Sequence, residues 1–236
     1  MEASLGCRAL NRQVRDCLRA SSQAEALAAV ALMPEAKVVK PLFSCLCSTE
    51  PLVKWHAVAA MGQTVAALAT AEMESARVVM RRFMWMLNDE SGGIGWGVPE
   101  AMAESIACHP RLAAEYSHCL ISFMREDGFY LELPALQQGL LWGVARVAEV
   151  FAQLLRDKDA VRYLLPYLDA ADPGVRGLAC LALGRLGDTS VLAALAPCQG
   201  DGRAVCLYQA GDFVQTTVDA LACQAIGSLS RPQGDS

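Results

Sequence analysis

The chain has 236 residues, of which 54% are hydrophobic and only 6% aromatic, and its formal net charge is −5. Alanine, leucine, valine and methionine must therefore fill the core, which suits close helix packing better than a β-sandwich. An acidic chain neutralises few phosphates, so this composition disfavours general binding to nucleic acid.

The sequence also argues against a membrane protein. No apolar run reaches the roughly 20 residues that a membrane-spanning helix needs. The polar N-terminal stretch lacks the apolar core of a signal peptide. We therefore expect a cytoplasmic protein whose cysteines are reduced.

In chain order, residues 1–35 predict N-terminal capping helices, and residues 36–187 predict the central repeats. Residues 188–230 predict a C-terminal repeat, and residues 231–236 a disordered tail. We expect these parts to form one repeat domain over residues 1–236, because a helix pair buries its apolar face only by stacking on another pair.

The repeat is visible as five segments that align without gaps and begin at residues 53, 94, 139, 175 and 218. Their spacing is close to the length of HEAT-like helical pairs. Apolar residues recur at i, i+3, i+4, i+7 and i+8, which predicts one buried helix face. Each segment ends on a small residue, which predicts close approach of a neighbouring helix: Gly62, Ala103, Ala148, Gly184 and Gly227.

A second helical stretch precedes each segment, and turn residues separate most pairs. The expected first helices cover residues 36–47, 72–88, 110–125, 158–169 and 189–197. The pattern therefore predicts an all-α fold, an α-solenoid of about five to six HEAT-like helical hairpins. Residues 203–218 instead alternate apolar and polar residues around Ala210-Gly211-Asp212, which predicts a small β-hairpin before the last helix. We expect this hairpin to close the C-terminal end of the solenoid.

The segment over residues 172–187 resembles the HEAT-like repeat of the phycobiliprotein-lyase type, with Asp172 and Arg176 at the motif's acidic and basic positions. Glu50 and Lys54 have the same spacing, and the resemblance implies that such side chains form a polar ladder between adjacent loops. Residues 80–104, 124–128 and 138–149 are also similar to a bacterial family of HEAT-like proteins, known mainly from anaerobic sulfate- and metal-reducing bacteria. This resemblance implies a fold and no activity.

Two loops are candidates for binding. The first contains Asp89 and Glu90 and leads to Trp96, and the second contains Arg125, Glu126, Asp127 and Tyr130. We expect both loops on one edge of the solenoid, since loops of one type lie along one edge. The alternative interpretation of the first loop is a helix-capping turn, and that of the second loop is a solvated edge.

Trp55 and Trp96 occupy the same position of their segments and could line the concave surface with Glu100. The alternative is that the tryptophans pack between repeats, because tryptophan side chains are mostly buried.

Cysteine and histidine residues raise the question of a metal site. Cys108, His109, His118 and Cys119 suit zinc by residue type, but their spacing matches no common zinc finger. Within apolar helical patterns, Cys180 and Cys223 are expected to act as small buried hydrophobes. We therefore predict no metal and no cofactor.

The sequence contains no Walker loop, dinucleotide fingerprint or nucleophile-elbow motif. We expect a non-catalytic scaffold that binds a protein or peptide partner, possibly a basic one, since solenoids present extended surfaces. The alternative is an accessory factor or lyase-like enzyme that acts on a cofactor or metal centre of a partner protein.

Overall fold

The structure is a computed structural model that describes residues 7–88 and 94–231. The chain divides into two compact units, residues 1–112 and residues 113–236, and each unit is described by itself. Helices dominate both units, and the sheet found in the described residues has two strands. The prediction of an all-α solenoid with a small β-hairpin is confirmed. The single repeat domain stays a prediction, and the expected tail lies, apart from Arg231, outside the described residues.

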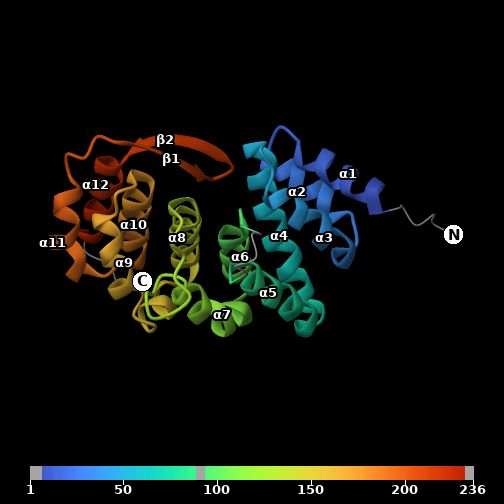
Figure 1. The fold of residues 1–236 in the computed structure, drawn as a ribbon, viewed down its shortest axis with the longest axis horizontal. Helices are drawn as coiled ribbons and strands as arrows, with labels where there is room; N and C mark the ends of the chain where they lie inside the picture. Colours follow the sequence, from blue (N-terminus) through green and yellow to red (C-terminus); the bar gives the residue numbers. More distant parts are fainter. Residues whose placement is uncertain (1–6, 89–93, 232–236) are drawn as a thin grey trace. The chain divides into compact units, whose positions relative to one another are not determined.

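In the N-terminal unit, successive helices pack as antiparallel pairs, and α4 lies against α2, α3, α5 and α6 (Figure 1). The two helices expected at the N-terminus are present. The helices are α1 (Cys7–Leu18), α2 (Gln23–Ala31), α3 (Glu35–Leu46), α4 (Pro51–Ala71), α5 (Met73–Leu87) and α6 (Val98–Ala107), followed by α7 (Pro110–Ser122), which continues into the second unit.

In the C-terminal unit, α10 is central and packs on α8 and α12 (Figure 1). Two expected helices are partly 3-10, because proline removes a backbone donor at Pro166 and Pro197. The elements are α8 (Pro134–Arg156), α9 (Ala160–Leu164), η1 (Leu165–Asp169), α10 (Pro173–Leu186), η2 (Thr189–Val191), α11 (Leu192–Leu195), η3 (Ala196–Cys198), β1 (Ala204–Gln209), β2 (Asp212–Thr217) and α12 (Val218–Leu229).

The small residues at the ends of the repeat segments do permit close helix packing at two of the predicted positions. A Cβ atom on Gly62 would lie 2.5 Å from Cγ of Glu104 in α6, and one on Gly184 would lie 2.7 Å from Cβ of Ala225 in α12. The prediction is wrong for Gly227, where a Cβ atom would meet nothing within 4 Å. Gly227 belongs to α12, the last helix of the described chain, and no further helix packs on it.

The segment that begins at residue 94 is not helical from its start. Helix α6 begins only at Val98, and Gly97 before it has a φ of 73°. A Cβ atom on Gly97 would lie 2.5 Å from the carbonyl oxygen of Leu46, so glycine is required there by both conformation and space. The prediction that Trp96 and Trp55 share one helical position is therefore wrong, because Trp96 precedes its helix.

A polar ladder runs along the starts of the second helices, as the lyase-type resemblance implies. In the N-terminal unit, Arg19 donates to Glu50 at 2.7 Å, and Lys54 Nζ lies 2.7 Å from Glu100 Oε1. In the C-terminal unit, Gln138 donates to Asp172 at 2.9 Å, and Arg176 donates to Asp201 at 2.9 Å. Each pair joins two repeats, so the prediction of a ladder is confirmed within each unit.

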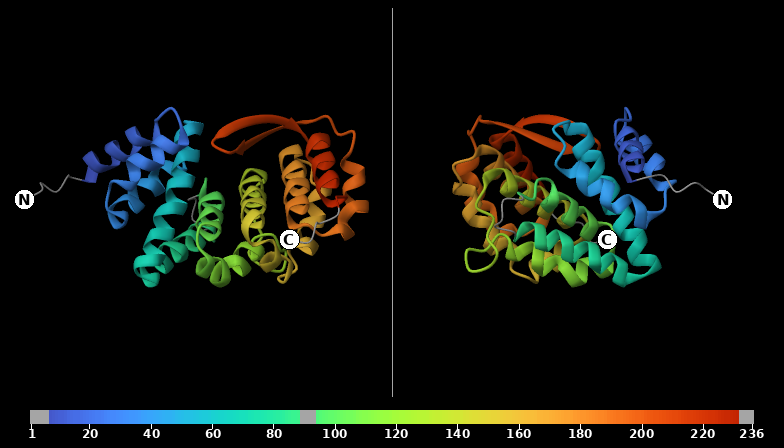
Figure 2. Two further views of the ribbon diagram at one scale, coloured as in Figure 1. Left: turned by 180° about the vertical axis from the view of Figure 1, so that it is seen from behind. Right: turned by 45° about the vertical axis from the view of Figure 1, so that its right-hand side comes forward.

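The β-hairpin has the expected place in the chain but not the expected position in space. Strands β1 and β2 pair antiparallel, and both turn residues, Ala210 and Gly211, have positive φ, as a type I′ turn requires. Strand β1 packs on α10, and the indole nitrogen of Trp142 in α8 donates to the carbonyl of Tyr208 at 2.8 Å. Figure 2 shows the hairpin crossing the ends of α10 and α8. The hairpin therefore covers these two helices and does not close the end of the solenoid.

Candidate functional site

The loop after α7 has a fixed shape. Phe129 N donates to the carbonyl of Ser122 at 3.0 Å, and Gly128 N donates to the carbonyl of Arg125 at 3.0 Å. A Cβ atom on Gly128 would lie 2.6 Å from the Ser122 carbonyl oxygen, so only glycine fits this turn. The loop therefore holds its side chains in defined positions.

Charged side chains of this loop pair with each other. Arg125 Nε and Nη2 donate to the two carboxylate oxygens of Asp127 at 2.9 and 2.7 Å. These hydrogen bonds lower the pKa of the Asp127 carboxyl. Glu126, between them, has no ion-pair partner within 4 Å among the residues that the structure describes. The loop thus carries one carboxylate that is free for a ligand.

Three tyrosines gather beside the loop. Gln137 donates to the Tyr130 hydroxyl at 3.0 Å, and the Tyr130 and Tyr167 ring centroids are 6.4 Å apart. The Tyr167 hydroxyl donates to the Met124 carbonyl at 3.2 Å, and burial raises the pKa of that hydroxyl. The Tyr163 ring lies 5.0 Å from the Arg125 guanidinium. This contact and these hydrogen bonds hold the aromatic rings in place.

Loop and tyrosines together line a pocket of about 570 Å³, which we call the tyrosine pocket. Its lining comprises residues 124–127, Tyr130, Gln137 and parts of α9 and η1 from Arg162 to Ala170. All four residues predicted from the second loop, Arg125, Glu126, Asp127 and Tyr130, line this pocket.

A second, wider pocket of about 1160 Å³ also lies along η1, and we call it the arginine pocket. It shares Arg162, Pro166, Asp169 and Ala170 with the tyrosine pocket. Because four residues line both, the two pockets adjoin at η1, and we call the pair of pockets the groove along η1.

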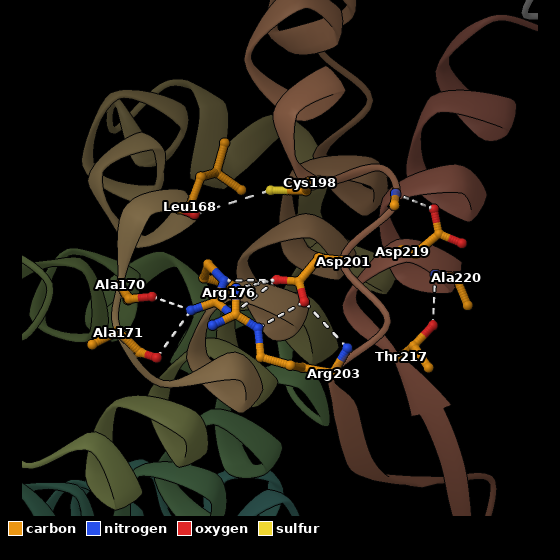
Figure 3. Close-up of polar contacts among 11 residues, drawn as sticks. Leu168, Ala170, Ala171, Arg176, Cys198, Asp201, Arg203, Thr217, Asp219 and Ala220 are labelled. Atoms are coloured by element: carbon orange, nitrogen blue, oxygen red, sulfur yellow. Dashed lines mark hydrogen bonds and ion pairs between the residues drawn. The ribbon is translucent and has the colours of Figure 1, made fainter.

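The wall of the arginine pocket is a network of two arginines on one carboxylate (Figure 3). Arg176 is buried and donates to Asp201 Oδ2 at 2.9 Å and to the carbonyls of Ala170 and Ala171. Arg203 donates to both oxygens of Asp201 at 2.8 Å. The hydrogen bonds from Arg203, and then those from Arg176, hold the pKa of the Asp201 carboxyl far below its ordinary value.

Other predicted site residues belong to the N-terminal unit. Asp89 and Glu90 lie outside the described residues. Trp96 is exposed in the turn before α6, and Trp55 is half-buried beside Lys54, whose Nζ lies 5.2 Å from the indole. Glu100 is buried and already paired with Lys54, so its carboxylate does not line an open surface.

The cysteine and histidine residues give no metal cluster. No group of three or more potential metal ligands occurs within residues 7–88 and 94–231. Cys119 Sγ lies 3.3 Å from His118 Nε2, so these two neighbours contact each other. Cys180 is buried as predicted, but Cys223 is exposed on α12, where the prediction of a buried thiol is wrong.

Sequence reasoning missed half of the groove. Arg162, Tyr163 and Asp169 belong to the expected helix over residues 158–169 and Arg203 to the expected hairpin over residues 203–218, whereas Asp201 lies between two expected elements. A usable signal was the proline at Pro166, which interrupts the helix and so leaves side chains around η1 exposed to a groove.

None of the described helices combines the length and the apolar character needed to cross a bilayer. A family model for HEAT repeats matches residues 142–210, from α8 to the turn of the hairpin. None of the curated proteins compared matches the sequence.

Solved structures with a similar fold include designed repeat proteins. One designed armadillo repeat protein is 17% identical with a TM-score of 0.52, over 93% of this chain and 99% of that chain. Another, in complex with the peptide (KR)4, is 17% identical with a TM-score of 0.53 over the same shares. An engineered protein is 14% identical with a TM-score of 0.52, over 93% and 96%. The chain therefore has the fold of HEAT- and armadillo-like helical repeat proteins, an architecture typical of protein-interaction scaffolds.

Proposed function

We propose that this chain is a non-catalytic scaffold that binds an extended, basic peptide segment of a partner protein in the groove along η1. The observation that carries the proposal is that the two pockets adjoin at η1, where they share four lining residues. An extended segment is long enough to occupy two adjoining pockets, whereas a small ligand needs only one.

The charge of the tyrosine pocket favours a basic side chain. Its lining contains Arg125, Glu126, Asp127, Arg162 and Asp169, which sum to one net negative charge. Arg125 is neutralised by Asp127, and Asp169 has no ion-pair partner within 4 Å in the described part of the chain. A lysine or arginine of the partner would supply the missing positive charge.

The aromatic side chains supply the anchors. Tyr130, Tyr163 and Tyr167 line the pocket, and Tyr130 and the adjoining Phe129 are exposed. Tyrosine is enriched among residues that dominate binding energy. A partner segment that covers Phe129 and Tyr130 would remove apolar surface from water.

The similarity to the designed armadillo protein that holds (KR)4 supports the class of ligand, although it concerns the fold alone. We further propose a cytoplasmic location, where cysteine thiols stay reduced. The resemblance to lyase-type repeats carries no part of the proposal. Trp55 and Trp96 stay predictions, as do Asp89 and Glu90.

The test uses fluorescein-labelled (KR)4 as the probe and fluorescence anisotropy as the readout. The double variant Glu126→Gln/Asp169→Asn removes two negative charges from the tyrosine pocket. We expect the Kd to rise about 3- to 10-fold, because each partly exposed ion pair contributes up to about 1 kcal/mol. We also expect the Kd of the variant to change less with salt concentration than the Kd of the wild type.

The control is Glu35→Gln/Asp157→Asn, which makes the same change in net charge at exposed positions that line neither pocket. It corrects for long-range attraction between the acidic chain and the basic peptide. Equal weakening by both double variants would refute the groove as the site. Absence of (KR)4 binding to the folded wild-type chain would refute the proposed function.

A further inference from the structure

The two ends of the groove carry opposite charges. Arg162 and Asp169 line both pockets, and their opposite charges cancel in the net charge of each lining. The residues that belong only to the tyrosine pocket, Arg125, Glu126 and Asp127, sum to one negative charge. Those that belong only to the arginine pocket are Arg176, Asp201 and Arg203, and they sum to one positive charge.

The positive charge is presented by one exposed guanidinium. Arg176 is buried, and four of its donor contacts go to Asp201 and to the carbonyls of Ala170 and Ala171. Asp201 can neutralise only one of its two arginine partners. The side chain of Arg203 is 61% exposed, against 8% for Arg176, so the excess charge is accessible at Arg203.

The segment that carries Arg203 is held rigidly. Gly200 N donates to Asp219 Oδ1 at 2.8 Å, and Asp219 N donates back to the carbonyl of Asp201 at 2.9 Å. Val218 N donates to the carbonyl of Arg203 at 3.2 Å. This segment is therefore fixed to the start of α12 at three points. Because the segment is already ordered, binding of an anion there costs little conformational entropy.

The guanidinium itself is already oriented. Nε and Nη2 of Arg203 both point at Asp201, and Nη1 has no hydrogen bond to the described residues. A planar guanidinium fixed on one side presents its remaining N–H groups in a defined direction. Cβ atoms on Gly200 and Gly202 would meet nothing within 4 Å, so the adjoining backbone leaves space for a ligand.

We propose that the arginine pocket binds a carboxylate of the same peptide segment whose basic residue enters the tyrosine pocket. The inference rests on the proposed function and narrows the partner to a bipolar segment, with basic residues at one end and an acidic side chain or a free C-terminus at the other. Charge complementarity along the groove then makes this segment bind more tightly than a uniformly basic one.

The test compares labelled peptides that share the start Lys-Arg-Lys-Arg and a Gly-Ser spacer. One series ends in Glu-Glu amide, one in Gln-Gln amide, and one in Gln-Gln with a free carboxylate. Spacers of two, four and six residues cover the unknown span, because an extended chain advances about 3.3 Å per residue. Anisotropy gives the Kd of each peptide.

We expect at least one Glu-Glu peptide to bind the wild-type chain about 3- to 10-fold more tightly than its Gln-Gln amide counterpart. Arg203→Gln should abolish this gain, so that the Glu-Glu and Gln-Gln amide peptides of one spacer length bind the variant with the same Kd. The control Arg12→Gln removes an exposed arginine of α1 and should retain the gain. A gain for the free carboxylate would identify a chain terminus as the preferred anion.

The inference fails if the Gln-Gln amide peptides bind but no acidic or carboxylate end tightens binding at any spacer length. It also fails if the gain survives in Arg203→Gln. If none of the peptides binds the folded wild-type chain, the proposed function fails and the inference fails with it. The thermal unfolding curve of Arg203→Gln shows whether the fold is retained.

Discussion

Replacement of two glycines that occupy the same repeat position should have opposite effects on stability. Gly184 in α10 and Gly227 in α12 are each the third residue from the end of their helix. A Cβ atom on Gly184 would lie 2.7 Å from Cβ and 2.8 Å from Cα of Ala225, whereas one on Gly227 would meet nothing within 4 Å. We expect Gly184→Ala to destabilise the chain and Gly227→Ala to stabilise it.

The magnitude follows from two opposing effects. Alanine is favoured over glycine inside a helix by up to about 1 kcal/mol, and this gain applies to both variants. At Gly184 the new methyl group needs about 3.5–4.0 Å from its neighbours, so α10 and α12 must separate by about 1 Å. Overpacking of this kind costs about 1–3 kcal/mol. The two variants should therefore differ by about 2 kcal/mol in the free energy of unfolding.

The assay is urea unfolding of the intact chain, followed by circular dichroism. With a denaturant dependence of about 2–3 kcal/mol per molar, typical of chains of this size, the two midpoints should lie roughly 0.5–1 M apart on opposite sides of the wild type. The reasoning is refuted if both midpoints move in the same direction by the same amount, since the contact between α10 and Ala225 would then have no energetic effect.

Two further predictions concern the wall of the arginine pocket. Arg176→Met should destabilise the chain by about 3 kcal/mol, because it leaves the carbonyls of Ala170 and Ala171 without their donor. Arg203→Met removes the exposed arginine that pairs with the same carboxylate and should shift the midpoint of urea unfolding much less. Equal shifts of the two midpoints would contradict this prediction. Asp201 has a lowered pKa in the folded chain, so its contribution to stability is complete above its unfolded pKa of about 4 and is lost as the pH falls further. The stability difference between wild type and Asp201→Asn, measured by urea unfolding, should thus be constant from about pH 8 to 5 and shrink below about pH 4, and a difference that shrinks already near pH 6 would argue against this assignment.

The sequence by itself determined the helical repeat and the site of the hairpin. Apolar periodicity is a local property, because each segment must bury one face whatever its neighbours are. Gly62 and Gly184 could be recognised as packing positions, and Ala210-Gly211 as a hairpin turn, since these residues have few alternative uses. The acidic and basic positions of the ladder followed from the resemblance of residues 172–187.

Only the tertiary structure decided what these elements contact. Gly227 has the sequence signal of Gly184 but lies at a place on α12 where a Cβ atom would meet no described residue within 4 Å. Likewise Trp96 has the position of Trp55 in the alignment, but it precedes α6, which begins only at Val98, after the left-handed residue Gly97.

The groove depended on tertiary structure most of all. Arg125, Tyr130 and their neighbours were identifiable as a loop, but Arg162 and Asp169 come from the next repeat and Arg203 from the segment before the hairpin. Sequence spacing carries no information on which of these loops meet, because the stacking of the helices sets the distance between loops. The shared lining of the two pockets, and with it the opposite charge of the two ends, exists only once α8, η1 and α10 have packed.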